Sequence, residues 1–198
     1  MSGTAEFFGT ELGLDVKYSI SRLYQSSVFS YHGCSLLLDG QGFDINDSYK
    51  VVVNNDLNVY VNIHSALETH RAYLDTHHSI DTTSKDNKNS KFLLSPSIMI
   101  IGAKDSGKST LSRILLNYAV KTGRKPLYID LDTNEGSMTL PGSISASAIK
   151  QYIDIEEGFS APVSLTGNSP LSYYYGYNSP LEAPSSYLSF CNNPFQFC

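Results

Sequence analysis

The chain has 198 residues, 41% of them hydrophobic, which is enough to bury the core of one domain or of two small ones. Its formal net charge of −5 excludes nucleic-acid binding by bulk electrostatic attraction, so any such contact must be local. The three cysteines follow no metal or disulfide spacing, and no apolar run reaches the length of a membrane span or resembles a secretory signal. We therefore predict a soluble protein of a reducing, intracellular compartment.

Residues 1–74 predict a small antiparallel β domain closed by a helix. Turn formers such as His32-Gly33 and Asp39-Gly-Gln-Gly42 separate short apolar runs, a pattern typical of short strands. The expected strands are Val28–Phe29, Ser35–Leu38, Val51–Val53 and Val59–Ile63. Apolar spacing then predicts a helix over Asn62–Leu74, with Ile63, Ala66, Leu67, His70 and Leu74 on one face. On that face, His70 fits a half-buried packing residue better than a metal ligand.

Residues 75–95 differ in character, because they are polar and charged and show no periodicity. This composition predicts a linker or a mobile loop. The pair His77-His78 has no Cys or carboxylate partner at metal-binding spacing, so we interpret it as part of a solvated loop.

Residues 96–198 predict an α/β domain with a parallel sheet. Ser97–Gly102 is a continuous apolar run, as expected of a parallel strand buried on both faces. Apolar residues recur at helical spacing after Lys108, and a second apolar run follows at Pro126–Asp132. Strand, helix and strand form a β-α-β unit with a right-handed crossover. Asp130 and Asp132 would then lie at the carboxyl edge of the sheet, where ligands of such folds bind.

Between the first strand and the helix, the chain reads GAKDSGKST, which matches the phosphate-binding pattern G-x-x-x-x-G-K-[S/T]. Glycines let backbone N–H groups approach a phosphate chain, the lysine adds a positive charge for the outer phosphates, and the serine hydroxyl can ligate Mg²⁺. The helix directs its positive N-terminus to the same place. The sequence thus predicts binding of a nucleotide with Mg²⁺. The predicted nucleotide-binding residues are Gly102, Ala103, Lys104, Asp105, Ser106, Gly107, Lys108, Ser109 and Thr110.

The C-terminal part is rich in Tyr, Ser, Pro and Asn. Tyr173-Tyr174-Tyr175 fits either a strand with interfacial tyrosines or a stacking surface for bases, and composition favours the strand.

Several segments resemble the polyribonucleotide 5′-hydroxyl-kinase family, in particular the Clp-type subunit of the pre-mRNA cleavage factor. The resemblance rests on AEFFGTEL (5–12), YHGCSLLLDG (31–40), HSALETHR (64–71), the phosphate loop with its helix, DLDTNEGSMTLPG (130–142) and YYYGYNSP (173–180). It implies a small β domain at 1–74, a linker at 75–95 and an incomplete P-loop kinase domain at 96–198. The family's first strands should precede residue 5, and the likeness fades after Pro180, so the chain resembles a family member truncated at both ends.

The resemblance also assigns roles to individual residues. It makes Lys108 the phosphate-binding lysine, Ser109 a Mg²⁺ ligand and Asp132 the base that takes the proton from the 5′-hydroxyl of RNA. On geometry alone, Asp132 serves equally well as a water-mediated Mg²⁺ ligand. The predicted catalytic residues are Asp132 and Lys108, and the predicted metal ligands are Ser109 and Asp132. Asp130 is expected to support the strand end, and Glu135 stands where the family usually has Gln.

Two functions follow as expectations from this resemblance. The first is an ATP-binding RNA 5′-hydroxyl kinase that acts in the nucleus in pre-mRNA 3′-end cleavage and polyadenylation. Its partners would be other cleavage-factor subunits, with the tRNA-splicing endonuclease as a further one. The second is a non-catalytic, ATP-bound scaffold or an inactive fragment, because the lid arginines of the family are missing from the chain. An unrelated P-loop ATPase or GTPase would not explain the N-terminal likeness, and no guanine-reading N-K-x-D motif is present.

Overall fold

The computed structural model describes residues 2–21, 27–40, 51, 57–81, 96–158 and 169–192. The chain forms two compact units. One combines Met1–Leu36 with Leu116–Cys198, and the other is Leu37–Leu115. The division falls inside helix α3 (Lys108–Lys121), so that the two halves of this helix belong to different units.

The N-terminal strands of the first unit are antiparallel, as predicted. β2 (Glu6–Phe7) pairs with β3 (Thr10–Glu11) and with β4 (Val28–Phe29), while β1 (Ser2–Gly3) pairs with β5 (Cys34–Ser35). The two-residue turn between β2 and β3 has φ angles of 47° at Phe8 and 85° at Gly9. Positive φ at both central residues matches the twist of a tight hairpin.

These strands pack on a later segment of the same unit. Ala5, Phe7 and Leu12 form a buried apolar cluster with Ile155, and Tyr18 packs against its edge. The cluster joins the first residues of the chain to residues that follow more than 140 positions later. A core of this kind depends on tertiary contacts that no local pattern displays.

The C-terminal half of α3 adds buried polar contacts to this core. The Asn117 side chain is 1% exposed, and its amide donates to the Phe8 carbonyl at 2.8 Å while its oxygen accepts from Ile153 N at 2.9 Å. The Tyr118 hydroxyl donates to the Glu6 carboxylate. Burial, followed by this hydrogen bond, raises the pKa of Tyr118 well above its usual value. Through these bonds, α3 holds the β2–β3 hairpin and the segment at Ile153 together.

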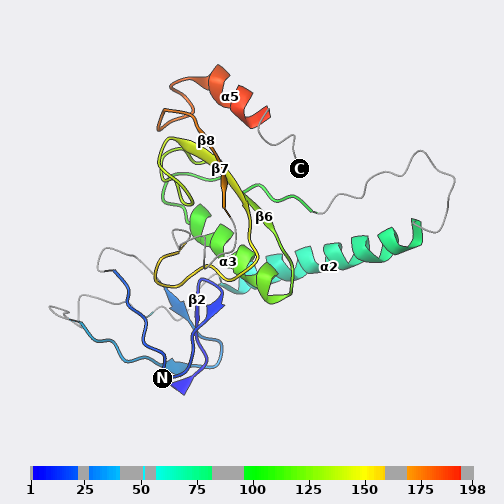
Figure 1. Cartoon of the computed structure of the whole chain (residues 1–198). Coiled ribbons are helices and arrows are strands. Elements are labelled where there is room, and N and C mark those ends of the chain that lie inside the picture. Colours follow the sequence, from blue (N-terminus) through cyan, green and yellow to red (C-terminus); the bar gives the residue numbers. More distant parts are fainter. Residues whose placement is uncertain are drawn as a thin grey trace. The chain divides into compact units, whose positions relative to one another are not determined.

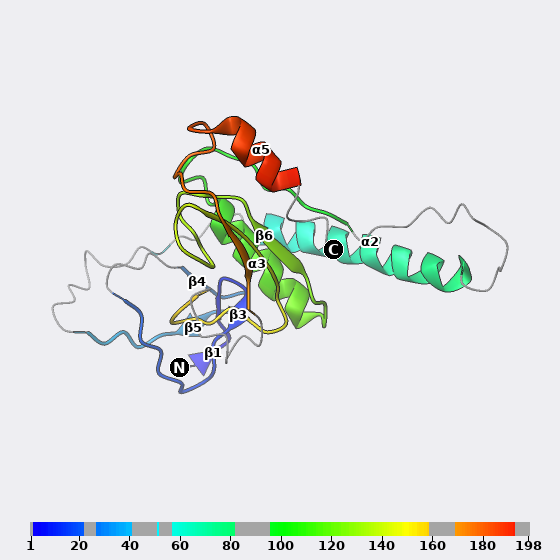
Figure 2. The same ribbon diagram turned by 45° about the horizontal axis from the view of Figure 1, so that its top comes forward.

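A three-stranded antiparallel sheet forms the rest of the first unit (Figures 1 and 2). Its strand order is β6 (Leu127–Asp130), β7 (Ser143–Ala148) and β8 (Leu171–Tyr174). Leu127 pairs with Ala148, and Ser143 pairs with Tyr174. The Ile144 side chain on the central strand is fully buried.

The prediction of a parallel sheet is wrong for the described residues, in which every strand pair is antiparallel. The connection from β6 to β7, residues 131–142, contains turns and no helix, whereas a parallel pair is usually joined by a helical crossover. Ser97–Gly102 forms no strand. Most of its side chains are solvent-exposed instead, with Met99 at 75% and Ile101 at 80%, while Ile100 is half-buried. A strand requires a hydrogen-bonded neighbour, and an apolar run by itself does not provide one.

Helix α2 (Leu57–Asp81) is longer than the helix predicted at Asn62–Leu74. It includes Val59–Ile63, for which the prediction of a strand is wrong, and it continues through residues 75–81 of the predicted linker. No Gly or Pro interrupts residues 57–81, and this continuity outweighs the strand preference of the β-branched residues at its start. The predictions for Val52, Val53 and residues 82–95 lie outside the described residues. No described helix is both long enough and apolar enough to cross a membrane.

The C-terminal segment is folded onto the first unit through aromatic contacts. α5 (Pro184–Asn192) begins with proline, whose missing N–H costs nothing at the first helical position. Tyr175 is 6% exposed, and its ring contacts those of Tyr187 and Phe190 with centroid distances of 5.6 Å and 6.2 Å. Its hydroxyl donates to the Ala183 carbonyl at 3.0 Å. The strand predicted at Tyr173 and Tyr174 is confirmed in β8, whereas Tyr175 lies just beyond its end.

Candidate nucleotide-binding site

The phosphate-loop motif forms an exposed loop directly before α3. Asp105 and Gly107 have φ angles of 59° and 82°, which turn the backbone sharply at two points. The Gly107 carbonyl accepts the hydrogen bond from Leu111 N at 2.9 Å, one of the first bonds of the helix. The loop therefore leads into the helix without an intervening spacer.

The loop curls around the start of the Lys108 side chain. Both the Lys108 ammonium and the Ser106 hydroxyl donate to the Ala103 carbonyl, at 2.7 Å and 2.8 Å. A Cβ atom added to Gly102 would lie 2.6 Å from Ser106 Oγ and 3.5 Å from Lys108 Cγ. A side chain at residue 102 would therefore require the Ser106 hydroxyl to move. Glycine at residue 102 thus leaves room for the Ser106 and Lys108 side chains, and Lys108 gives the loop the positive charge that a cradle for phosphate requires.

The electrostatics of the loop favour an anion. The first turn of α3 contains no acidic residue, so its N-terminal N–H groups and Lys108 act together on a ligand placed before the helix. Ser109 is exposed and Thr110 is half-buried, both within this first turn. Ala103, Lys104 and Asp105 are exposed on the loop. The residues present therefore fit a polyphosphate with an accompanying cation.

A turn after β6 carries the predicted carboxylates. Asp130 is buried, and its carboxylate accepts from Asp132 N at 3.0 Å, from Ser137 N at 3.1 Å and from the Ser137 hydroxyl. Asp132 is exposed, and its Oδ1 accepts from Asn134 N at 2.9 Å. Asp130 thus holds the turn, as predicted for a residue that supports the strand end, and Asp132 points toward solvent.

The predicted site residues belong to different units. Gly102–Thr110 lie in the unit Leu37–Leu115. Asp130 and Asp132 lie in the unit that combines Met1–Leu36 with Leu116–Cys198. A joint Mg²⁺ site of Ser109 and Asp132 remains a prediction. Within the described part of the chain, no three His, Cys, Asp or Glu side chains are grouped as metal ligands.

Two residues not predicted from the sequence, Ser137 and Tyr187, lie at the carboxylate turn. The Ser137 hydroxyl donates a hydrogen bond to the Asp130 carboxylate. The Tyr187 hydroxyl donates to the Leu131 carbonyl at 3.0 Å. Burial, followed by the neighbouring Cys191 and Asp132, raises the pKa of Tyr187 to about 12. Ser137 could have been found from its place in a turn beside a buried carboxylate, but Tyr187 follows 55 residues after Asp132 and has no local signal.

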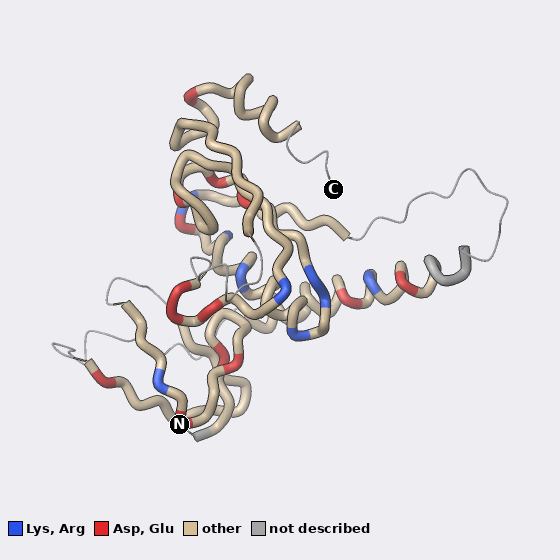
Figure 3. Tube along the Cα trace, viewed as in Figure 1, with Lys and Arg blue, Asp and Glu red and all other residues tan. Residues whose placement is uncertain are grey.

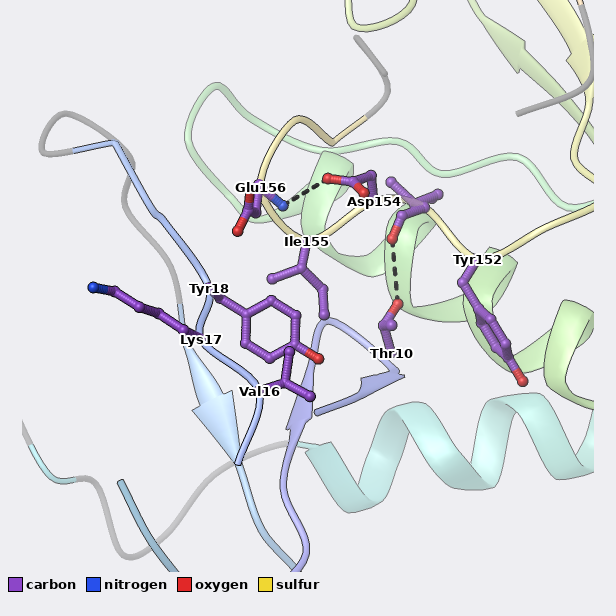
Figure 4. A pocket seen from close by; sticks show the side chains of 9 residues that line it. Thr10, Val16, Lys17, Tyr18, Tyr152, Asp154, Ile155 and Glu156 are labelled. Carbon is purple, nitrogen blue, oxygen red and sulfur yellow. Dashed lines mark hydrogen bonds between the residues drawn. The ribbon is translucent and has the colours of Figure 1, made fainter. Parts of the chain in front are cut away.

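A shallow groove of about 360 Å³ lies in the first unit, and no residue of the loop lines it (Figure 4). The ring of Tyr18 lies beside Val16 and Ile155 in its wall. Its polar groups bond to one another: Thr10 Oγ1 donates to the Ile153 carbonyl at 3.4 Å, and Asp154 Oδ1 accepts from Glu156 N at 2.8 Å. We therefore base the candidate site on the loop and not on this groove.

Comparison with known proteins decides the family. Residues 102–198 match the family model described as the P-loop of the mRNA cleavage and polyadenylation factor CLP1. Residues 1–74 match the model of the N-terminal β-sandwich domain of the polyadenylation factor. The chain belongs to the CLP1 family. The predicted resemblance is thereby confirmed, and both family models apply in the order that the sequence suggested.

Relatives with similar sequences come from animals and fungi. The chain is 36% identical to the CLP1 homolog of Nematostella vectensis and to the human polyribonucleotide 5′-hydroxyl-kinase Clp1, each over 180 residues. These alignments cover 91% of this chain and 37% of each relative, so the chain spans little more than a third of their length. The mRNA cleavage and polyadenylation factor clp1 of Aspergillus niger is also 36% identical, over 94% of this chain and 35% of its own.

Solved structures of Clp1p with Pcf11p share this fold. One, which describes their extended interface and the structural basis for ATP loss in a point mutant, has a TM-score of 0.70 and 25% identity. The matched region covers 95% of this chain and 42% of the chain in that structure. The wild-type complex has a TM-score of 0.67 with 24% identity, over 95% of this chain and 41% of its own.

Proposed function

We propose that this chain binds ATP with Mg²⁺ at Gly102–Thr110. The observation that carries the proposal is the loop itself, in which the Lys108 ammonium donates to the Ala103 carbonyl and a Cβ atom at Gly102 would displace the Ser106 hydroxyl. The loop leads into α3, whose first turn contains no acid. An anion at this point meets a lysine charge and a helix N-terminus together. The family membership supports the same ligand, since a Clp1p structure is described in terms of ATP loss.

Each residue of the site has a distinct proposed role. Lys108 neutralises the outer phosphates, while the loop N–H groups hold the inner ones. Ser109 offers its hydroxyl to Mg²⁺, which when bound offsets charge on the phosphate oxygens. Asp132 accepts the proton of a 5′-hydroxyl or holds Mg²⁺ through water. Asp130 and Ser137 hold the turn from which Asp132 projects.

At the level of the reaction, we infer an ATP-dependent polyribonucleotide 5′-hydroxyl kinase of nuclear mRNA 3′-end cleavage and polyadenylation. The names of the relatives in human and Aspergillus niger support this inference. Its domains would be 1–74, a linker at 75–95 and a P-loop domain at 96–198. A Pcf11-type subunit is the proposed partner, because Clp1p is found in complex with Pcf11p. The tRNA-splicing endonuclease is a further proposed partner.

A non-catalytic ATP-bound scaffold, or an inactive fragment, is the second candidate. Phosphoryl transfer depends on positive charge around the transferred group. The segment 126–149, which includes β6, β7 and the carboxylate turn, contains Asp130, Asp132 and Glu135 but no Lys or Arg. This segment supplies a base and no cation, so a cation for catalysis must come from elsewhere. The charge pattern favours a chain that binds ATP without transferring phosphate by itself.

The first experiment tests nucleotide binding. Mg²⁺-ATP should raise the melting temperature of the chain, because a ligand that binds only the folded state stabilises it. Lys108→Ala should abolish most of the rise by removing the charge on the outer phosphates. Lys125→Ala, which removes an equal charge from an exposed position outside the loop, is the matched control and should keep the rise. Equal stabilisation of all three proteins would refute the assignment.

The second experiment separates the two candidate functions. Radiolabelled ATP and an RNA oligonucleotide with a 5′-hydroxyl are incubated with the chain and with its Asp132→Asn variant. Labelling by the chain that vanishes in the variant would establish the kinase and the role of Asp132. ATP binding without labelling would identify the scaffold.

A further inference from the structure

The C-terminal helix α5 is tied to the turn that carries Asp132. The Tyr187 hydroxyl of α5 donates to the Leu131 carbonyl at 3.0 Å, although the two residues are 56 positions apart in the sequence. Leu131 directly follows β6, and its carbonyl belongs to the peptide unit that leads into Asp132. α5 therefore contacts the carboxylate turn, residues 131–137, at the backbone of the residue that the sequence predicts as a base or a Mg²⁺ ligand.

The peptide unit between Leu131 and Asp132 is held from two sides. Its C=O accepts from the Tyr187 hydroxyl. Its N–H, which belongs to Asp132, donates to Asp130 Oδ1 at 3.0 Å. The unit is trans and planar, so its C=O and N–H point in opposite directions from one rigid plane. Hydrogen bonds on both sides oppose rotation of this plane, and the plane sets the direction in which the Asp132 side chain leaves the backbone.

The Asp132 carboxylate depends on the backbone for its direction because it is exposed. Its Oδ1 accepts from Asn134 N at 2.9 Å, within the same turn. Asp130 and its partner Ser137, which hold the N–H side of the peptide unit, lie at the two ends of that turn. Tyr187 reaches the turn from a separate element, so it couples the direction of the carboxylate to the fold around α5.

Helix α5 is itself anchored, which makes the Tyr187 hydroxyl a fixed donor. The Tyr187 ring meets the buried Tyr175 ring edge-to-face at a centroid distance of 5.6 Å. The Tyr175 hydroxyl donates to the Ala183 carbonyl, directly before the helix, at 3.0 Å. Tyr175 N donates to the Gly142 carbonyl at 2.7 Å, and Gly142 N donates to the Thr133 carbonyl at 2.7 Å. Tyr175 thus connects α5 to the carboxylate turn a second time.

The contact from α5 is uncharged. The helix contains no Asp, Glu, Lys or Arg, and its trace in Figure 3 carries no charged position. A lysine or arginine at this point would pair with the Asp132 carboxylate and weaken it as a base. The Tyr187 phenol is a neutral donor, which holds the backbone and leaves the charge of the carboxylate uncompensated.

We propose that Tyr187 is a positioning residue for Asp132. By holding the Leu131 carbonyl, its hydroxyl fixes the direction in which the Asp132 carboxylate projects toward the 5′-hydroxyl of RNA or the water shell of Mg²⁺. This inference rests on the proposed function of Asp132. A general base acts only within hydrogen-bond reach of the proton that it takes, and a misplacement of about 1 Å can cost about 100-fold in rate.

The test is an NMR measurement on the whole, isotope-labelled chain. Tyr187→Phe keeps the ring against Tyr175 and removes only the hydroxyl. We expect the amide of Asp132 to exchange with solvent about fivefold faster, as the loss of one hydrogen bond predicts. The three-bond couplings of Asp132 should change from those of one χ1 rotamer to those of an average over rotamers. Tyr174→Phe, which removes a hydroxyl from a side chain that is 72% exposed in β8, is the matched control and should match the parent chain.

The Ile153 amide separates this local effect from a general loss of stability, because it donates to Asn117 in the same unit. Its exchange should be unchanged in Tyr187→Phe. Equal acceleration at Ile153 and Asp132 would overturn the proposal, as would parent-like exchange and couplings at Asp132. Neither measurement uses ATP or RNA, so a failure of this inference is distinguishable from a failure of the proposed function.

The radiolabelling assay adds a kinetic readout where it detects phosphate transfer. Tyr187→Phe should then lower kcat at least about tenfold at saturating ATP and leave the KM for ATP unchanged, because the hydroxyl acts on Asp132 and not on the nucleotide. An unchanged kcat would contradict the positioning role.

Discussion

Asn117 offers a demanding test of how the first unit is held together. Its side chain makes two hydrogen bonds to backbone groups that lie more than 100 residues and 36 residues away along the chain, at Phe8 and Ile153. Asn117→Ala removes both. The Ile153 N–H is buried and should cost about 1–3 kcal/mol when left unpaired, whereas the partly buried Phe8 carbonyl should cost about 1 kcal/mol.

The net magnitude follows from these terms. Alanine has a higher helix propensity than asparagine and returns about 0.5 kcal/mol. We therefore expect Asn117→Ala to lower the free energy of unfolding by about 1.5–3.5 kcal/mol, which for a chain of this size corresponds to a fall in melting temperature of about 3–14 °C. That loss is a large fraction of the stability of an ordinary domain.

The assay is thermal unfolding followed by circular dichroism at low protein concentration. Asn58→Ala is the matched control, because Asn58 is also helical but exposed, so that only the helix propensity changes. The control should melt within about 2 °C of the parent chain. A melting temperature of Asn117→Ala equal to that of the control would refute the reasoning, since the buried bonds would then contribute nothing to stability.

Two further predictions concern the loop and α5. Gly102→Ala should weaken the ATP-dependent rise in melting temperature, because it places a methyl group against Ser106 Oγ. The double variant Gly102→Ala/Ser106→Ala should restore much of this rise. If the double variant is equally defective, the contact with Ser106 does not cause the weaker binding. The pKa of Tyr187 is raised to about 12 from about 10, so folding favours its neutral form, and this stabilisation is complete below pH 10 and is lost between about pH 10 and 12. Tyr187→Phe cannot ionise and should lack this pH-dependent loss of structure in near-ultraviolet circular dichroism, whereas an unchanged pH profile would contradict the assignment.

Much of the candidate site could be predicted from sequence because its determinants are local. The loop at residues 102–107 needs glycines at fixed positions and a lysine at the start of a helix, and these lie within nine consecutive residues. Helix α3 was predictable for the same reason, since its apolar spacing repeats within one element. The hairpin partners near the N-terminus also lie close together in the sequence.

The pairing of the strands in the sheet could not be predicted from local sequence. The apolar runs at Ser97–Gly102 and Pro126–Asp132 have similar composition, yet only the second contains a strand, β6. What distinguishes them is a hydrogen-bonding neighbour: β7 returns beside β6, and no described strand pairs with Ser97–Gly102. Strand direction and pairing depend on which segments come into contact in the folded chain, and the composition of one segment does not determine its neighbours.

The same division applies to individual residues. Lys108 and Gly102 were assigned from the sequence because their roles depend on neighbours along the chain. Asn117 and Tyr187 acquire roles only through distant partners, the Phe8 and Leu131 carbonyls. A helical pattern placed His70 on a buried face, whereas the structure exposes it. Periodicity states which residues share a face of a helix, but only tertiary packing decides which face is covered, because coverage depends on the elements that lie against it.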